Sequence, residues 1–366
     1  MVVAVVGAGN GGQAAAGMLA LAGHRVRLHD IEAAKVEPVA AARGIEVTGP
    51  VAAGLAPIEY AGTELSQALD DAEFVIVIVP GAAQAEAVTA VAQHFADVLP
   101  VLLHPGCTGG ALECSRILRQ AGSRAAVGET DSFLYACRLL EPGTTFVGAV
   151  KAEVRVGVLP ADAGAAFVAL VGEVFPQAEE ASSVLETSLG NMNAMLHVGP
   201  MLANAGRIES HASNFEFYGQ GITPSVARML EQVDEERLAL CHELDVQGRS
   251  IREWIRQTYG VAGPSLHETI QKLNREVYRT SPAPAMLEHR YLTEDVGEGF
   301  VPLEALGHAV GLPMELTGGL VTLASAALGR DFRTEGRTAA RMGIDGLGTD
   351  EILKLVTEGG YLGADH

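Results

Sequence analysis

Three glycines near the start of the chain have the spacing of a dinucleotide-binding turn. Gly7, Gly9 and Gly12 form the pattern G-x-G-x-x-G, between the apolar run Val2–Val6 and an alanine-rich segment with helical character, residues 14–22. The first glycine permits a tight strand-to-helix turn, the second lets a pyrophosphate approach the backbone, and the third allows close packing of helix on strand. The following helix would present its N–H groups and partial positive charge to the phosphates. The alternative is a glycine-rich turn that binds no nucleotide.

Three further residues are expected to contact the same cofactor. Asp30 ends a second strand at the spacing where a carboxylate bonds the adenine ribose hydroxyls. The residues after it include no arginine for a 2′-phosphate, and Glu32 would repel one, so the pattern favours NAD over NADP. Asn10 stands inside the glycine turn. Pro80 follows the apolar run Phe74–Val79, at the carboxyl end of a predicted central strand, where ligands bind in parallel sheets.

A second group of polar residues lies on an apolar helical segment predicted over residues 189–208. Asn193, His197 and Asn204 fall within about 40° of one another on an α-helix. Pro200 removes one backbone hydrogen bond and should bend this helix. A histidine on such a stripe is either a catalytic group or a structural histidine at a helix kink.

Arg290 and Asp295 form a third candidate pair. They are five residues apart, which on a straight α-helix separates them by about 140°, so they would not act as one helical pair. In an irregular segment both side chains could face the same cleft. The alternative is a solvated, charged turn before a helix at Pro302.

The elements that must position these residues predict two domains. Residues 1–180 alternate strands and helices, which is typical of an α/β protein with a Rossmann-type, doubly wound parallel sheet. Within it, residues 45–48 and 55–60 are expected to form a local excursion, 145–150 to continue the sheet, and 154–158 to be its edge. Residues 181–366 are dominated by helical segments and predict an all-α domain.

Composition excludes several classes of protein. The chain has 366 residues and a formal net charge of −20, which argues against nucleic acid or anionic membrane as a partner. No apolar run is long enough to span a bilayer, and no secretory signal is visible at the start. The four cysteines form no C-x-x-C pair, so we expect a reduced, cytoplasmic protein without a metal site. The apolar helices permit a homodimer.

Together these segments resemble the opine dehydrogenases over nearly the whole chain. The resemblance includes the glycine turn, the turn at 104–111, Glu129-Thr130 with the following 135–138, the Asn193-x-x-x-His197 helix and the Arg290/Asp295 segment. It implies that His197 is the acid/base, that Asp295 orients it, and that Arg290 binds a substrate carboxylate, with Asn193 near the substrate. Relatives commonly have asparagine where His104 stands here.

The chemistry of that family suits these residue types. An L-amino acid condenses with a 2-oxo acid such as pyruvate to give an imine, which NADH reduces to an N-(carboxyalkyl) amino acid. Histidine titrates near neutral pH, and a carboxylate on its other ring nitrogen fixes the tautomer. A guanidinium can form two parallel hydrogen bonds with a substrate carboxylate. Thr130, at the end of a predicted strand, is a further candidate for that carboxylate; the alternative is a threonine that caps a turn.

Two other functions remain open. A reductase of a small hydroxy acid, or of the glycerol-3-phosphate or ketopantoate type, has a similar domain order but commonly carries a lysine on the inter-domain helix. This chain has no lysine between Lys151 and Lys272, which counts against that reading. A non-catalytic NAD(H) sensor would keep the glycine turn and Asp30 but would not need His197 beside Asp295.

Overall fold

The computed structural model describes residues 1–94, 99–211, 214–278 and 281–360, and it divides the chain into two compact units. Unit 1 consists of residues 1–188 together with 353–366, and unit 2 consists of residues 189–352. The last helix, α18 (Thr349–Glu358), therefore runs from unit 2 into unit 1. The predicted boundary at 180/181 lies shortly before this division.

Unit 1 is built on an eight-stranded sheet with the order β12-β11-β8-β7-β6-β1-β2-β5. Its strands are β1 (Val2–Val6), β2 (Arg25–His29), β5 (Tyr60–Gly62), β6 (Phe74–Val77), β7 (Val101–Leu103), β8 (Val127–Thr130), β11 (Val154–Leu159) and β12 (Ala178–Glu180). All neighbours pair in parallel except β11 and β8. The prediction of a central strand at β6 is confirmed, because β6 lies between β1 and β7 and is buried along its whole length.

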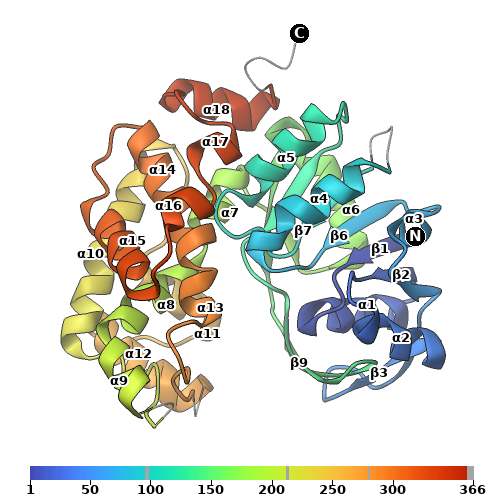
Figure 1. The fold of residues 1–366 in the computed structure, drawn as a ribbon, viewed down its shortest axis with the longest axis horizontal. Helices are drawn as coiled ribbons and strands as arrows, with labels where there is room; N and C mark the ends of the chain where they lie inside the picture. The colour runs from blue at the N-terminus through green and yellow to red at the C-terminus, as the bar shows by residue number, and fades with distance from the viewer. Residues whose placement is uncertain (95–98, 212–213, 279–280, 361–366) are drawn as a thin grey trace. The chain divides into compact units, whose positions relative to one another are not determined.

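The helices of unit 1 connect these strands. They are α1 (Asn10–Leu21), α2 (Ala33–Ala42), α3 (Leu65–Leu69), η1 (Gly81–Ala83), α4 (Gln84–Ala92), α5 (Gly110–Gln120), η2 (Ala161–Ala163), α6 (Gly164–Val174) and α7 (Val184–Leu189). Helices α4 and α5 pack on each other, α6 packs on β11 and β12, and α1 follows the first strand (Figure 1). A parallel sheet buried by connecting helices is the expected Rossmann-type arrangement.

A second sheet was not foreseen. It has four strands in the order β4-β3-β10-β9: β3 (Gly44–Thr48), β4 (Gly54–Pro57), β9 (Tyr135–Glu141) and β10 (Thr144–Val150). All four strands contact α1 (Figure 1). Gly17 makes this possible, since a Cβ there would lie 2.7 Å from a methyl group of Val47.

Two strand predictions are therefore wrong. Residues 145–150 pair with β3 and β9 in the second sheet and do not continue the main one. Strand β11 is not an edge, because β12 pairs with its far side. Both errors concern which strand pairs with which, and hydrophobic runs alone do not encode pairing partners.

Unit 2 is helical in the parts that the structure describes. Its helices are α8 (Met192–Ala203), α9 (Ala205–His211), α10 (Pro224–Glu243), α11 (Ile251–Tyr259), α12 (Leu266–Leu273), η3 (Asn274–Tyr278), α13 (Arg290–Thr293), η4 (Val296–Phe300), α14 (Val301–Ala309), α15 (Glu315–Leu328), α16 (Phe332–Glu335) and α17 (Ala339–Met342). Helix α10 has Pro224 at its first position and the Thr223 hydroxyl accepting from the Val226 N–H, which is a common helix start. The all-α C-terminal domain is confirmed.

The long helix predicted over residues 189–208 is wrong in its continuity. The chain forms α7, α8 and α9 there, with breaks at Gly190-Asn191 and at Asn204. The Asn204 amide donates to the Pro200 carbonyl at 2.8 Å and to the Gly221 carbonyl at 3.0 Å. An asparagine that bonds backbone groups in this way competes with helix continuation.

Candidate active site

His197 and Asp295 form a buried pair inside unit 2. Nδ1 of His197 lies 2.7 Å from Oδ2 of Asp295, and the two residues are 8% and 7% exposed. A carboxylate only accepts, so Nδ1–H donates to Asp295 and this tautomer leaves the lone pair of the neutral ring on Nε2. Nε2 is therefore the nitrogen that can exchange a proton with another group.

Two tyrosines complete the surroundings of this ring. The hydroxyl oxygen of Tyr218 lies 3.0 Å from Nε2 of His197. Tyr291 stacks on the imidazole with ring centroids 3.6 Å apart and planes 14° apart. The imidazole is thus held from three sides, by a carboxylate, a hydroxyl and an aromatic face.

Asp295 lies one wide helical turn after Arg290. Its N–H donates to the Arg290 carbonyl at 3.2 Å, and the Phe300 N–H donates to the Asp295 carbonyl at 3.0 Å, both across five residues. This is the π-helical pattern, which is rare and frequent at functional sites. The segment is thus irregular, as the sequence analysis allowed, and the 140° of a straight α-helix does not apply to it. Arg290 is exposed and bonds Glu294, whereas Asp295 is buried against His197, so the two residues do not form a pair with each other.

Arg290 presents its guanidinium on the outside of unit 2. Its side chain is 63% exposed, and Nε donates to Oε2 of Glu294 at 3.0 Å. Such a group can fork onto a carboxylate that arrives from solvent. Its role in substrate binding stays a prediction.

The π-helical turn η4 is fixed by a buried ion pair. Glu298, in η4, lies 3.1 Å from the guanidinium of Arg337, whose side chain is fully buried. The Arg337 N–H donates to the Gly297 carbonyl at 2.9 Å. The segment after α16 therefore anchors the turn that follows Asp295.

The predicted polar stripe on α8 does not act as one unit. Asn193 is exposed, whereas His197 points into the interior and Asn204 bonds backbone carbonyls. The substrate contact proposed for Asn193 stays a prediction.

In unit 1, the glycine turn has the shape required for a dinucleotide. A Cβ on Gly7 would overlap the Ile78 carbonyl oxygen, and one on Gly12 would overlap the Gly7 carbonyl oxygen. These two glycines are therefore required by the fold itself. At Gly9, in contrast, no atom of the described residues beyond its two chain neighbours lies within 4 Å of an added Cβ. This open backbone at the start of α1 fits the close approach of a pyrophosphate.

Asp30 ties the glycine turn to the second strand. Oδ2 accepts from the Ala8 N–H at 2.7 Å and Oδ1 accepts from the Glu32 N–H at 2.9 Å. A carboxylate has about four acceptor sites, so ribose hydroxyls remain compatible with these bonds. Lys35, 3.6 Å from Asp30 and 2.6 Å from Glu32, is a cation that the sequence argument overlooked.

Asn10 and Pro80 are the other two predicted cofactor contacts. The side-chain oxygen Oδ1 of Asn10 accepts from the Leu139 N–H at 2.5 Å, and the side-chain nitrogen Nδ2 donates to the Cys137 carbonyl at 3.4 Å. Asn10 therefore joins α1 to β9. Pro80 is exposed between β6 and η1. Contact of either residue with the cofactor stays a prediction.

Thr130 ends β8 with its hydroxyl in the interior of unit 1. It is 1% exposed, and Oγ1 lies 2.7 Å from Nδ1 of His104. The Leu134 N–H points at Nε2 of His104 at 3.3 Å, so Nδ1 carries the proton and donates to Thr130. Burial, and secondarily Lys151, lower the pKa of His104 to about 3. His104 is thus a neutral, structural histidine, and a substrate contact for Thr130 stays a prediction.

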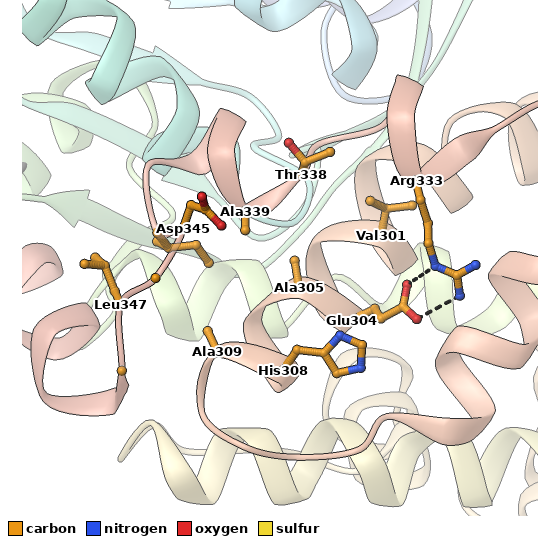
Figure 2. Close-up of a pocket in the computed structure, with 13 residues that line it drawn as sticks. Val301, Glu304, Ala305, His308, Ala309, Arg333, Thr338, Ala339, Asp345 and Leu347 are labelled. Atoms are coloured by element: carbon orange, nitrogen blue, oxygen red, sulfur yellow. Dashed lines mark hydrogen bonds and ion pairs between the residues drawn. The ribbon is translucent and has the colours of Figure 1, made fainter.

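Unit 2 also contains a pocket of about 650 Å³ beside α14, α16 and α17. Figure 2 shows Arg333 forked onto Glu304 in its wall, with both N–O distances 2.8 Å. None of the predicted site residues lines this pocket.

Tyr218, Tyr291 and Arg337 were not predicted from the sequence. A usable signal existed for Tyr218: Phe215, Phe217 and Tyr218 crowd three aromatic residues into four positions of a chain that is 5% aromatic. No comparable signal marks Arg337, because a buried arginine looks like any surface arginine in the sequence.

A Rossmann-type unit with an open glycine turn, joined to a helical unit with a buried histidine–carboxylate pair, defines a dinucleotide-dependent oxidoreductase. A family model described as "NAD/NADP octopine/nopaline dehydrogenase, alpha-helical domain" matches residues 180–328, and one described as "Ketopantoate reductase PanE/ApbA" matches residues 3–105. An opine dehydrogenase of Arthrobacter sp. (strain 1C) is 38% identical over 354 residues, covering 96% of this chain and 98% of that protein.

The chain therefore belongs to the opine dehydrogenase family, and it is an NAD(H)-dependent oxidoreductase acting on CH–NH groups. A vitopine synthase of Allorhizobium ampelinum is 26% identical over 79% of each chain. An octopine dehydrogenase solved with NADH and L-arginine has the same fold, with a TM-score of 0.81 at 20% identity, covering 96% of this chain and 98% of that one. No helix among the described residues is long and apolar enough to cross a membrane.

Proposed function

We propose that this protein joins an L-amino acid to a 2-oxo acid such as pyruvate and uses NADH to reduce the resulting imine. The observation that carries the proposal is the buried pair of His197 and Asp295, 2.7 Å apart. The relatives support the substrate classes, since octopine dehydrogenase has been solved with NADH and L-arginine and with NADH and pyruvate.

Each residue of unit 2 has a distinct task in this reaction. Asp295 holds the His197 ring in one tautomer and stabilises its protonated form. Nε2 of His197 gives and takes the protons that imine formation requires. Arg290 binds a carboxylate of the substrate, which both reactants carry. The nicotinamide, when bound, supplies the hydride.

The cofactor is assigned to residues of unit 1. Gly7, Gly9, Gly12 and the start of α1 would hold the pyrophosphate, and Asp30 the adenine ribose. We propose NAD over NADP because Asp30 and Glu32 place two carboxylates where a 2′-phosphate would lie, against the single ammonium of Lys35. We also propose a cytoplasmic homodimer; all four cysteines are thiols, which suits a reducing compartment.

The test is NADH oxidation by the purified protein with pyruvate, with and without a panel of amino acids, followed by mass analysis of the product. Amine-dependent oxidation with formation of an N-(1-carboxyethyl) amino acid supports the proposal. Oxidation that needs no amine indicates a hydroxy-acid or ketopantoate-type reductase, which the match of residues 3–105 brings into consideration. Light scattering on the same sample tests the dimer.

A further inference from the structure

Nε2 of His197 already has a hydrogen-bond partner within the protein. A ring nitrogen forms one strong hydrogen bond in its plane, and the Tyr218 hydroxyl, at 3.0 Å, takes that position. A substrate oxygen can therefore exchange a proton with His197 in two ways. Either Tyr218 moves aside, or the proton passes through the Tyr218 hydroxyl.

The backbone that carries Tyr218 is held on both sides. The Phe217 N–H donates to the Ser281 carbonyl at 2.7 Å, and the Gly221 N–H donates to the Glu216 carbonyl at 3.0 Å. Glu216 in turn accepts from the Asn274 amide at 2.7 Å. These bonds leave the segment little freedom to withdraw.

The Tyr218 ring is equally confined. It packs edge-on against Phe217, with centroids 5.1 Å apart, and at a tilt of 37° against Tyr278, with centroids 4.9 Å apart. The residue is 9% exposed. A ring packed in this way disfavours displacement and favours passage of the proton through its hydroxyl.

The phenol also has the right protonation behaviour. Burial, followed by the neighbouring tyrosines, raises the pKa of Tyr218 well above its ordinary value. The hydroxyl stays neutral near pH 7, so it can accept a proton and donate one at the same time.

We propose that Tyr218 is a catalytic residue that relays protons between Nε2 of His197 and the reacting substrate. This rests on the proposed function. When the amine nitrogen bonds to the carbonyl carbon, the C=O π pair moves to oxygen. With His197 in its protonated form, which Asp295 stabilises, that oxygen takes the proton of the Tyr218 hydroxyl as Tyr218 takes the proton on Nε2, which leaves the ring neutral. The proton released by the amine returns to His197 by the reverse path, so atoms and charge balance.

The test compares Tyr218→Phe with Tyr278→Phe. Both variants remove one hydroxyl from the same buried aromatic cluster, but the Tyr278 hydroxyl lies 3.3 Å from Tyr259 and not beside His197. We expect Tyr218→Phe to lower kcat by about a hundredfold or more, as loss of a proton-transfer group does, while Tm and NADH affinity stay near those of the wild type. We expect Tyr278→Phe to retain kcat, and the solvent deuterium isotope effect on kcat to change only in Tyr218→Phe.

A kcat for Tyr218→Phe equal to that of Tyr278→Phe would overturn the relay, as would an unchanged kcat with a lower KM for the 2-oxo acid, which is the result for a hydroxyl that is displaced. If Tyr218→Phe folds poorly, 3-fluorotyrosine at position 218 preserves the ring and acidifies the hydroxyl. A kcat that is insensitive to the fluorine then overturns the relay. If NADH oxidation by the wild type needs no amine, the proposed opine function fails. The ratio of kcat for Tyr218→Phe to kcat for the wild type, in whichever reaction is observed, still tests the relay.

Discussion

Nδ1 of His197 and Oδ2 of Asp295 lie 2.7 Å apart, although 98 positions separate the two residues along the chain. Helix α8 supplies the histidine, and the π-helical turn after α13 supplies the carboxylate. Both residues are buried within unit 2, and the hydrogen bond joins the Nδ1 side of the ring to the carboxylate. From this hydrogen bond we predict how substitution of each residue changes kcat.

Replacing Asp295 by Asn should lower turnover while leaving the imidazole in place. The amide no longer fixes the tautomer or stabilises imidazolium, so we expect a loss of about 10² to 10⁴ in kcat. His197→Ala should lower kcat by at least about a hundredfold. NADH affinity, followed by fluorescence, should remain unchanged in both variants because the residues proposed to bind the cofactor lie in unit 1. Full turnover in either variant would remove the pair from the mechanism.

Arg290→Met should weaken binding of a substrate carboxylate. Loss of a charge-assisted hydrogen-bonded pair costs about 1.5–3 kcal/mol, so KM for the 2-oxo acid should rise roughly tenfold to a hundredfold with a smaller change in kcat. The matched control is Arg256→Met, since Arg256 is similarly exposed, at 58%, and pairs with Glu253 on its own helix. An equal KM in the two variants would contradict the assignment.

Arg337→Met should be strongly destabilising. It removes the buried guanidinium that lies 3.1 Å from Glu298, while the guanidinium of Arg341 stays 3.8 Å from that carboxylate. Breaking a buried ion pair typically lowers the free energy of unfolding by about 3–5 kcal/mol. The exposed pair of Arg256 and Glu253 should contribute less than about 1 kcal/mol, so Arg256→Met again serves as the control. Denaturant unfolding of both variants measures the difference. Similar stability for the two would mean that the ion pair does not hold the turn after Asp295.

Gly9→Ala should separate cofactor binding from folding. The added methyl meets no described atom beyond the two neighbouring residues, so Tm should stay close to the wild-type value. It would stand where the pyrophosphate approaches, so the Kd for NADH should rise by about tenfold or more, about 1.4 kcal/mol. Gly172→Ala, on the open side of α6, is the control and should leave NADH binding unchanged. Tight NADH binding by Gly9→Ala would place the cofactor elsewhere.

His104 should make the protein less stable in acid. Burial holds its pKa at about 3 in the folded state, below the ordinary value of 6.5. The unfolded chain therefore binds the proton more readily, and stability is lost as pH falls from 6.5 towards 3, by up to about 1.4 kcal/mol per pH unit. His104→Asn removes this titration, so its stability should decline less steeply with falling pH. Parallel curves for wild type and variant between pH 6.5 and 4 would exclude this effect.

The sequence by itself determined the features whose causes are local. The glycine turn, Asp30 and the buried strand β6 were all predictable, because the spacing of glycines and the periodicity of apolar residues act over a few positions. The Thr223 cap of α10 was predictable for the same reason. The two-domain class followed from the change from alternating strands and helices to helices alone.

Tertiary structure decided what depends on distant partners. The second sheet over α1, the pairing of β11 with β12, and the contact of His197 with Asp295 join segments whose separation hides them from local patterns. The π-helical turn at Asp295 is fixed by the buried ion pair of Arg337 and Glu298. The Tyr218 hydroxyl reaches Nε2 of His197 through the packing of the Tyr218 ring. Side-chain type and spacing specify which chemistry the chain can perform; long-range packing selects which of those side chains meet.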